Sequence, residues 1–112
     1  MLLRHLVAIG IAVLSLCWAA FAEVPVVSDE VLALQGDPEF GAYLAAECVG
    51  CHRADGASEG IPSVTGWPVE DFVLAMHAYK QKLRPHPAMQ VMADRLSDEE
   101  IAALAAYFKD LE

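Results

Sequence analysis

Two cysteines and a histidine stand together in the string Cys48-Val49-Gly50-Cys51-His52. The pattern C-x-x-C-H is the attachment signature of c-type haem. Two intervening residues, as one helical turn, place both sulfurs on the same side, where they reach the two vinyl groups on one edge of a porphyrin. His52 follows directly and is in place to act as the proximal ligand of the iron. The string therefore predicts one covalently bound haem c, held by Cys48, Cys51 and His52.

Other uses of a C-x-x-C pair fit this sequence less well. A thioredoxin-like dithiol is expected beside a βαβ pattern, and no segment here has the pattern of strands. A structural zinc site needs four ligands, but His77 and His86 are nine residues apart and form no second pair of closely spaced ligands. A disulfide across two residues closes almost no loop and therefore stabilises little. Haem attachment is the interpretation that remains.

The iron then needs a sixth ligand, and the candidates are Met76, His77, His86, Met89 and Met92. Met76 falls on the apolar stripe of a predicted helix, where methionine is more often a core residue. His77 is expected off that stripe, near the surface, and His86 is expected to be exposed in a loop, although a two-histidine haem stays open. Met89 is predicted to lie in a loop between helices, where backbone can be shaped around a metal. Met92 is the alternative, and is otherwise expected to pack against the porphyrin or the last helix.

Helix signals surround the haem string. Asp37 and Pro38 predict the start of a helix, as cap and first helical residue. This helix is expected to run to about Cys48, with apolar Phe40, Tyr43 and Leu44 on one face. Residues 53–66 hold three glycines and one proline without apolar periodicity. They predict a functional loop around one edge of the haem.

Two more helices are predicted beyond this loop. Pro68 opens the first, its apolar stripe is Phe72, Met76, Tyr79 and Leu83, and Pro85 and Pro87 are expected to end it. Residues 84–93 are then expected to form a second loop. A capping box of Ser97 and Glu100 starts the last helix, which is expected to run to about Asp110 with Ile101, Leu104, Ala105 and Phe108 inward. The fold class is therefore all-α, with three main helices around a flat apolar cofactor.

The N-terminal residues 1–22 have the layout of a secretory signal peptide. They contain 18 apolar residues, one arginine and no acid, and they end in Ala20-Phe21-Ala22. The apolar run is shorter than a bilayer span, so we expect cleavage after Ala22, export to the periplasm and no stable membrane insertion afterwards. Cleavage also removes Cys17. Residues 23–35 are expected to form a lead segment, extended at 24–27 with a short helical turn in 28–34, followed by the haem domain at 36–112.

The composition of residues 23–112 narrows the function. They carry 6 basic and 16 acidic residues, a formal charge of -10, and half of them are apolar. Such a chain has no electrostatic footprint for nucleic acid or anionic lipid, and its apolar content argues against disorder. A redox partner is expected to present a basic docking patch. No triad or paired carboxylates indicate an enzyme, so the chain is expected to be an electron-transfer protein.

The sequence resembles the short bacterial class I cytochromes c, and most closely the single-haem domain of flavocytochrome c sulfide dehydrogenase. The resemblance covers about residues 36–111. Besides the haem string, the matching residues are Gly41, Leu44, Gly60-Ile61-Pro62, Tyr79-x4-Arg84-x4-Met89, Leu96-Ser97-Asp98 and Ala105-Ala106-Tyr107-Phe108. It implies the class I cytochrome c fold, with one covalent haem.

The resemblance also implies roles for individual residues. Met89 matches the family's sixth ligand, and the carbonyl of Pro62 matches the acceptor of the proton on the proximal imidazole. Gly41 would let the last helix cross closely near Tyr107 and Phe108. Arg84 either lies near the haem propionates or is a solvated charge.

The implied function is that of a periplasmic one-electron carrier with His/Met ligation. The alternative is a haem subunit bound to an oxidoreductase, such as a flavoprotein that oxidises sulfur compounds. A ligand sensor or haem enzyme would need an open sixth site.

Overall fold

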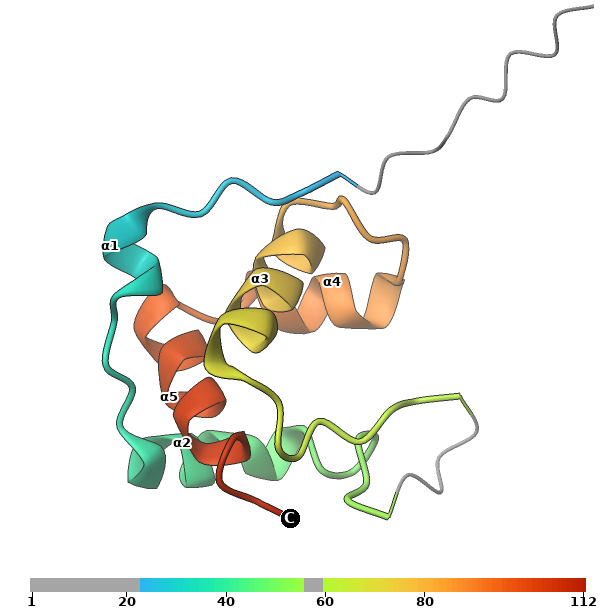
Figure 1. The fold of residues 1–112 in the computed structure, drawn as a ribbon. Helices are drawn as coiled ribbons and strands as arrows, with labels where there is room; N and C mark the ends of the chain where they lie inside the picture. The colour runs from blue at the N-terminus through green and yellow to red at the C-terminus, as the bar shows by residue number, and fades with distance from the viewer. Residues whose placement is uncertain (1–22, 56–59) are drawn as a thin grey trace, which may run out of the picture.

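The computed structural model describes residues 23–55 and 60–112. Within these ranges, all the assigned secondary-structure elements are helices. The predicted signal peptide, residues 1–22, lies outside the described residues. Figure 1 shows the chain order, which is α1 (Asp29–Leu32), α2 (Pro38–Leu44), the 3₁₀ turn η1 (Ala45–Glu47), α3 (Val69–Lys80), α4 (Pro87–Asp94) and α5 (Asp98–Phe108). The predicted all-α class is confirmed.

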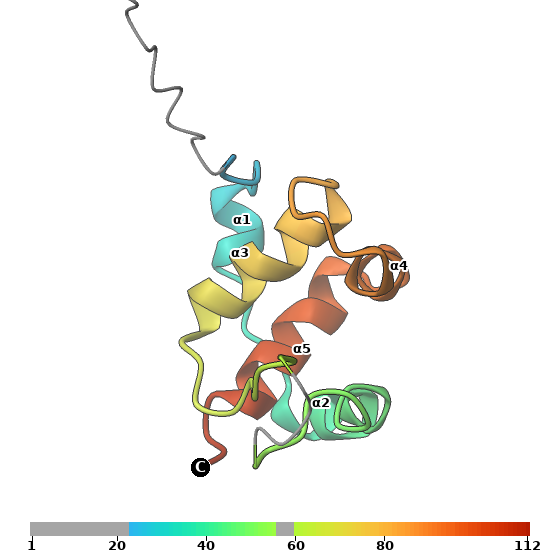
Figure 2. The ribbon, with the colours of Figure 1, turned by 90° about the vertical axis from the view of Figure 1, so that its right-hand side faces the viewer.

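Helix α5 is the centre of the fold, with α3 packed on one side and α2 on the other (Figure 2). The capping box is present: the Ser97 hydroxyl accepts from the Glu100 amide, and the Glu100 carboxylate accepts from the Ser97 amide. The four residues expected to point inward are all buried. The Phe108 ring stacks on Phe72 with 5.8 Å between the ring centroids. The prediction for this helix is confirmed apart from its end, which is Phe108 and not Asp110.

Helix α2 and the residue before its cap both approach α5 at very short range, because glycine stands at each point of contact. A Cβ atom built on Gly41 would lie 2.0 Å from the carbonyl oxygen of Ala103 and 2.8 Å from Cβ of Tyr107. One built on Gly36 would lie 1.9 Å from the carbonyl oxygen of Ala102. The close crossing at Gly41 is confirmed. The equally tight position at Gly36 was not predicted.

The predicted apolar face of α2 is wrong for its two aromatic residues, whereas Leu44 packs against the core as expected. Tyr43 is 79% exposed and Phe40 is 41% exposed, whereas Gly41 and Ala45 are buried. At Gly41 the close crossing with α5 leaves no room for a side chain, so this position faces inward and the aromatic residues of α2 point outward.

Residues 84–93 do not form the predicted loop, because most of them belong to α4. Pro87 is the first residue of this helix, and the Nδ1 atom of His86 accepts from the Met89 amide as its N-cap. The sequence analysis took Pro87 as a stop signal, but proline is equally favoured at the first position of a helix. Within residues 23–55 and 60–112 there are therefore four helices of seven residues or more, where three main helices were predicted.

Helix α3 also ends earlier than predicted, at Lys80, and Pro68 is its N-cap. The chain then turns at Lys82, whose φ is 62°. This left-handed turn ends the helix before Pro85 is reached.

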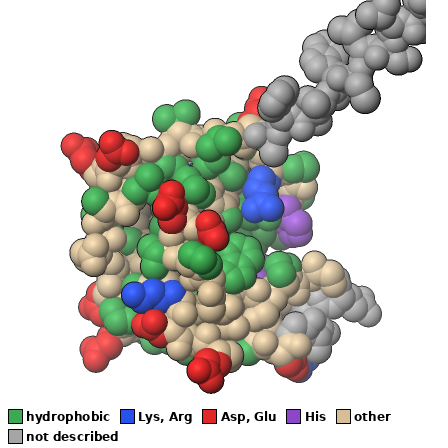
Figure 3. Space-filling view, in the orientation of Figure 1, with side chains coloured by type: hydrophobic (Ala, Val, Ile, Leu, Met, Phe, Trp, Pro, Cys, Tyr) green, Lys and Arg blue, Asp and Glu red, His purple; other side chains and the backbone are tan. Residues whose placement is uncertain are grey.

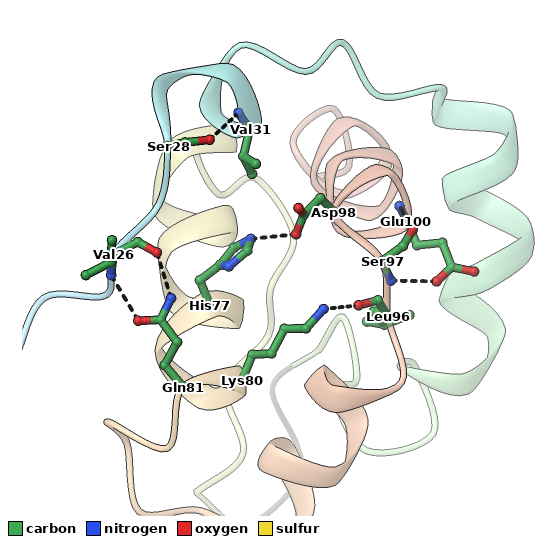
Figure 4. Close-up of polar contacts among 10 residues, drawn as sticks. All are labelled: Val26, Ser28, Val31, His77, Lys80, Gln81, Leu96, Ser97, Asp98 and Glu100. Carbon is green, nitrogen blue, oxygen red and sulfur yellow. Dashed lines mark hydrogen bonds and ion pairs between the residues drawn. The ribbon is translucent and has the colours of Figure 1, made fainter.

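The lead segment packs along α3 and the core (Figure 4). The Val26 amide donates to Oε1 of Gln81 at 2.9 Å, and Nε2 of Gln81 donates back to the Val26 carbonyl at 2.7 Å. The Ser28 hydroxyl caps α1, and Val27, Val31 and Leu32 pack against the core. The expected extended stretch and short helical turn are confirmed. None of the helices in the described ranges is long and apolar enough to span a membrane.

Candidate haem site

One pocket brings together most of the predicted haem residues, from the haem string and from α4. Cys48, Cys51 and His52 line one side of it, and Met89 and Met92 of α4 line it as well. Its remaining lining is mostly apolar and includes Val64, Trp67, Phe72, Met76, Leu104 and Phe108. In the space-filling view the outline is indented on the right, where hydrophobic, basic and histidine side chains meet (Figure 3).

The haem string forms a tight turn around one carbonyl group. The amides of Cys51 and His52 both donate to the carbonyl of Cys48, at 3.1 and 2.8 Å. Both thiols and the imidazole therefore come from a single turn that directly follows η1. Cys48 and Cys51 form no disulfide with each other; Cys51 is exposed and Cys48 is half-buried. Burial, together with Glu47 and Cys51 nearby, raises the pKa of the Cys48 thiol.

The imidazole of His52 is oriented by the backbone of the loop. Nδ1 of His52 lies 2.8 Å from the carbonyl oxygen of Pro62. A carbonyl oxygen only accepts, so Nδ1 carries the proton and Nε2 keeps the lone pair that a metal would use. This is the contact that the resemblance implied for Pro62. Such a hydrogen bond fixes the tautomer of the ring and raises its basicity.

The candidate thioether ligands lie on α4 and α3. Met89 and Met92 are three residues apart on α4, so they share a face, and both are half-buried. Met89 lies in the first turn of a helix and not in a loop as predicted. Met76 also lines the pocket, but it is 7% exposed and belongs to the core cluster of α3, as expected.

A basic group lies at the pocket beside two aromatic rings. The Arg84 guanidinium lies over the Tyr79 ring, 5.0 Å from its centroid, and both residues line the pocket. The His86 ring meets Tyr79 edge-on at 6.2 Å. His86 is exposed and caps α4, and it is not among the described residues that line the pocket. The positive charge of Arg84 suits the carboxylates that haem carries.

The prediction of a surface position for His77 is wrong. This residue of α3 is 7% exposed, and its Nε2 lies 3.4 Å from Oδ1 of Asp98 in the first turn of α5 (Figure 4). The sequence analysis assigned a single apolar stripe to α3. In the structure the buried face is wider, because α4, α5 and the lead segment all contact this helix or its end. His77 therefore lies inside the fold but outside the haem pocket.

Val64 lines the pocket from the loop and was not predicted. It is 8% exposed, although it lies between helices. In the sequence, Val64 is an isolated apolar residue between Pro62 and Trp67, and no hydrophobic periodicity indicates that it is buried.

The residues of the pocket fit a haem group. Two thiols on one turn match the two vinyl groups, and an imidazole with a protonated Nδ1 offers its other nitrogen to iron. A thioether is available from α4, and the flat apolar lining excludes water. This donor set is the one that c-type haem uses.

Comparison with known proteins agrees with this site. Residues 39–108 match the family model described as cytochrome C oxidase, cbb3-type, subunit III. The chain is 36% identical over 75 residues to cytochrome c4 of Pseudomonas aeruginosa, covering 65% of this chain and 37% of that protein. It is 34% identical over 84 residues to cytochrome c-554(548) of Halomonas halodenitrificans, covering 69% and 99%. It is 36% identical over 72 residues to the cytochrome subunit of sulfide dehydrogenase of Chlorobaculum tepidum, covering 63% and 66%. The chain thus spans about a third of the first relative and nearly all of the second.

Proposed function

Since the chain is a class I c-type cytochrome of the family that matches residues 39–108, and hence an electron-transfer haem protein, we propose that it is a periplasmic one-electron carrier. A single haem c would be attached through Cys48 and Cys51, with His52 and Met89 as axial ligands. The observation that supports this proposal best is the pocket itself, which brings these four side chains together on an apolar lining.

The residues of the pocket would each contribute to electron transfer. When bound, haem supplies an iron that exchanges one electron between two oxidation states. The Pro62 carbonyl orients His52 and raises its basicity. Met89 offers a soft, neutral donor that favours the reduced state and raises the reduction potential relative to two histidines. With His52 and Met89 both bound to it, the iron would offer no open site to oxygen or peroxide.

Ligand substitution tests the axial assignment. We expect Met89→Ala to abolish the far-red sulfur-to-iron absorption band of the oxidised protein, and Met92→Ala to keep it. The opposite pattern would assign the ligand to Met92. A band that is absent from the unaltered protein, with a spectrum changed by His86→Ala, would indicate two histidine ligands.

Covalent attachment and the open-site alternative have separate tests. We expect the denatured protein to stain for haem peroxidase activity on a gel and a Cys48→Ala, Cys51→Ala double variant to lose the stain. The reduced protein is expected to bind carbon monoxide slowly or not at all at neutral pH. Rapid binding would favour a sensor or haem enzyme.

Two observations support a periplasmic location. Residues 1–22 have the layout of a cleaved signal, and covalent haem attachment takes place outside the cytoplasm. Osmotic-shock fractionation should release the haem protein with Glu23 at its N-terminus. Recovery with residues 1–22 attached would contradict cleavage.

A second candidate is a haem subunit held by a flavoprotein that oxidises sulfur compounds. The match to the cytochrome subunit of sulfide dehydrogenase favours it. Co-purification of a flavoprotein from native periplasm would support this candidate, and monomeric elution would support a free carrier. In either case the formal charge of -10 on residues 23–112 favours a partner with a basic docking patch.

A further inference from the structure

We propose that Lys80 is a positioning residue for the axial methionine, because it holds the end of α4 against α3 and so fixes the helix that carries Met89. The inference rests on the proposed function, since it requires Met89 to be the ligand. It adds a residue that does not line the pocket.

Two lysines at the end of α3 hold the end of α4. Nζ of Lys80 donates to the carbonyl oxygen of Leu96, two residues beyond the last residue of α4 (Figure 4). Nζ of Lys82 lies 2.5 Å from Oδ2 of Asp94, the last residue of α4. We call these two contacts the α3–α4 clasp. Lys80 is half-buried, whereas the side chains of Lys82 and Asp94 are each 51% exposed.

The clasp matters because α4 buries little of itself. Ala93 is the only buried residue among its eight, and Val91 is 60% exposed. Because so little of its surface is buried, this short helix gains little hydrophobic stabilisation. Polar contacts at its end therefore contribute a larger share of its attachment than they do for α3 or α5.

The charge of Lys80 acts in the same direction as its hydrogen bond. Leu96 lies beyond the last residue of α4, so the ammonium group of Lys80 binds a carbonyl of the short segment that joins α4 to α5. A hydrogen bond from a charged donor in a half-buried place is also stronger than one between neutral groups. Loss of this nitrogen would leave the Leu96 carbonyl without its donor.

Backbone strain at Lys82 points to the same region. Its φ of 62° is a left-handed conformation that residues with a Cβ atom rarely adopt. Strain of this kind persists where the surrounding contacts hold the chain in place. Here it coincides with the residue that pairs with Asp94.

The clasp reaches Met89 through the helix itself. Met89 lies in the first turn of α4, and a helix of two turns moves as one body. Release of its C-terminal end lets the whole helix withdraw from the pocket. The thioether would then yield more easily to a competing ligand.

Imidazole titration of the oxidised holoprotein measures this competition. Added imidazole displaces the thioether, and loss of the far-red band reports the displacement. We expect Lys80→Met to bind imidazole about tenfold more tightly than the unaltered protein. Lys82→Met should bind it roughly twofold more tightly, because its ion pair is half-exposed. Lys80→Arg, which keeps a charged donor, should stay within about twofold of the unaltered protein.

Lys109→Met is the matched control. Lys109 is exposed at the end of α5, and within the described residues its side chain makes no polar contact. Its removal is expected to leave the imidazole affinity unchanged. Denaturant unfolding of each variant is measured in parallel, because a lysine with only a structural role would lower the unfolding midpoint without changing that affinity.

Unchanged imidazole affinity in Lys80→Met would overturn the proposal, whatever happens to the midpoint. If Lys80→Met fails to incorporate haem, Lys82→Met provides the test. An imidazole affinity of Lys82→Met equal to that of Lys109→Met would then overturn the proposal. Failure of the proposed function would give a different result. If Met89 is not the ligand, Met89→Ala keeps the far-red band, while the lysine variants still differ from one another in imidazole affinity.

Discussion

Replacement of Gly41 by alanine tests whether the crossing of α2 and α5 holds the fold together. The new Cβ atom would lie 2.0 Å from the carbonyl oxygen of Ala103, whereas ordinary contact begins at 3.4 Å. The two helices must therefore separate locally by about 1.4 Å. The nearest atoms belong to the backbone of α5, so no flexible side chain can move aside.

The cost of this change is estimated from two opposing terms. Overpacking of a dense core costs about 1 to 3 kcal/mol, and the rigid backbone places this site near the upper value. Alanine in place of glycine within a helix returns about 1 kcal/mol of helix propensity. We therefore expect the free energy of unfolding to fall by about 2 kcal/mol. For a domain of this size that lowers Tm by about 8 to 16 °C.

Thermal denaturation of the oxidised holoprotein, followed by far-ultraviolet circular dichroism, measures the effect. Gly50→Ala is the matched control, because a Cβ atom there meets nothing within 4 Å. It adds the same methyl group at an open position of the haem string. A Gly41→Ala protein that melts within about 2 °C of Gly50→Ala would refute the argument from the close crossing.

Three further predictions concern the helix cap, the thiols and the partner. Ser97→Ala should lower the unfolding free energy by about 1 kcal/mol, because it removes half of the capping box; an unchanged denaturant midpoint would contradict this. In the protein before haem attachment, iodoacetamide should modify Cys51 faster than Cys48 at mildly alkaline pH. Burial raises the pKa of Cys48 and leaves less thiolate there, so the difference should narrow as pH rises; equal rates by peptide mass spectrometry would exclude it. Electron transfer to a basic partner should slow as salt rises in stopped-flow measurements, and rates that are flat with salt would remove the expected complementarity.

The sequence predicts the elements whose signals are local. The capping box and the inward residues of α5 follow from one stretch, residues 97–108, and both are confirmed. The haem string is equally local, because its chemistry lies within five consecutive residues. Gly41 was recognised through the family resemblance, and the structure supplies the steric reason.

The predictions that were wrong concern residues whose positions depend on contacts with other parts of the chain. A proline such as Pro87 can end one helix or begin the next. The hydrogen bond from the Met89 amide to Nδ1 of His86 caps α4, and so favours a helix that begins at Pro87. His77 is buried because Asp98, twenty-one residues later, lies against it. Tyr43 points outward because α5 approaches too closely for its ring. None of these outcomes follows from the periodicity of a single helix.

The paired hydrogen bonds between Gln81 and Val26 fix the N-terminal chain in one alignment. A slip of one residue in one direction would present Pro25 to Gln81, and proline has no amide proton to donate. A slip in the other direction would present Val27, whose side chain would lose its place against the core. The lead segment therefore has a single register on α3, set by one glutamine. Homologous chains that lack an amide side chain at this position would have no such constraint on where their N-terminal residues lie.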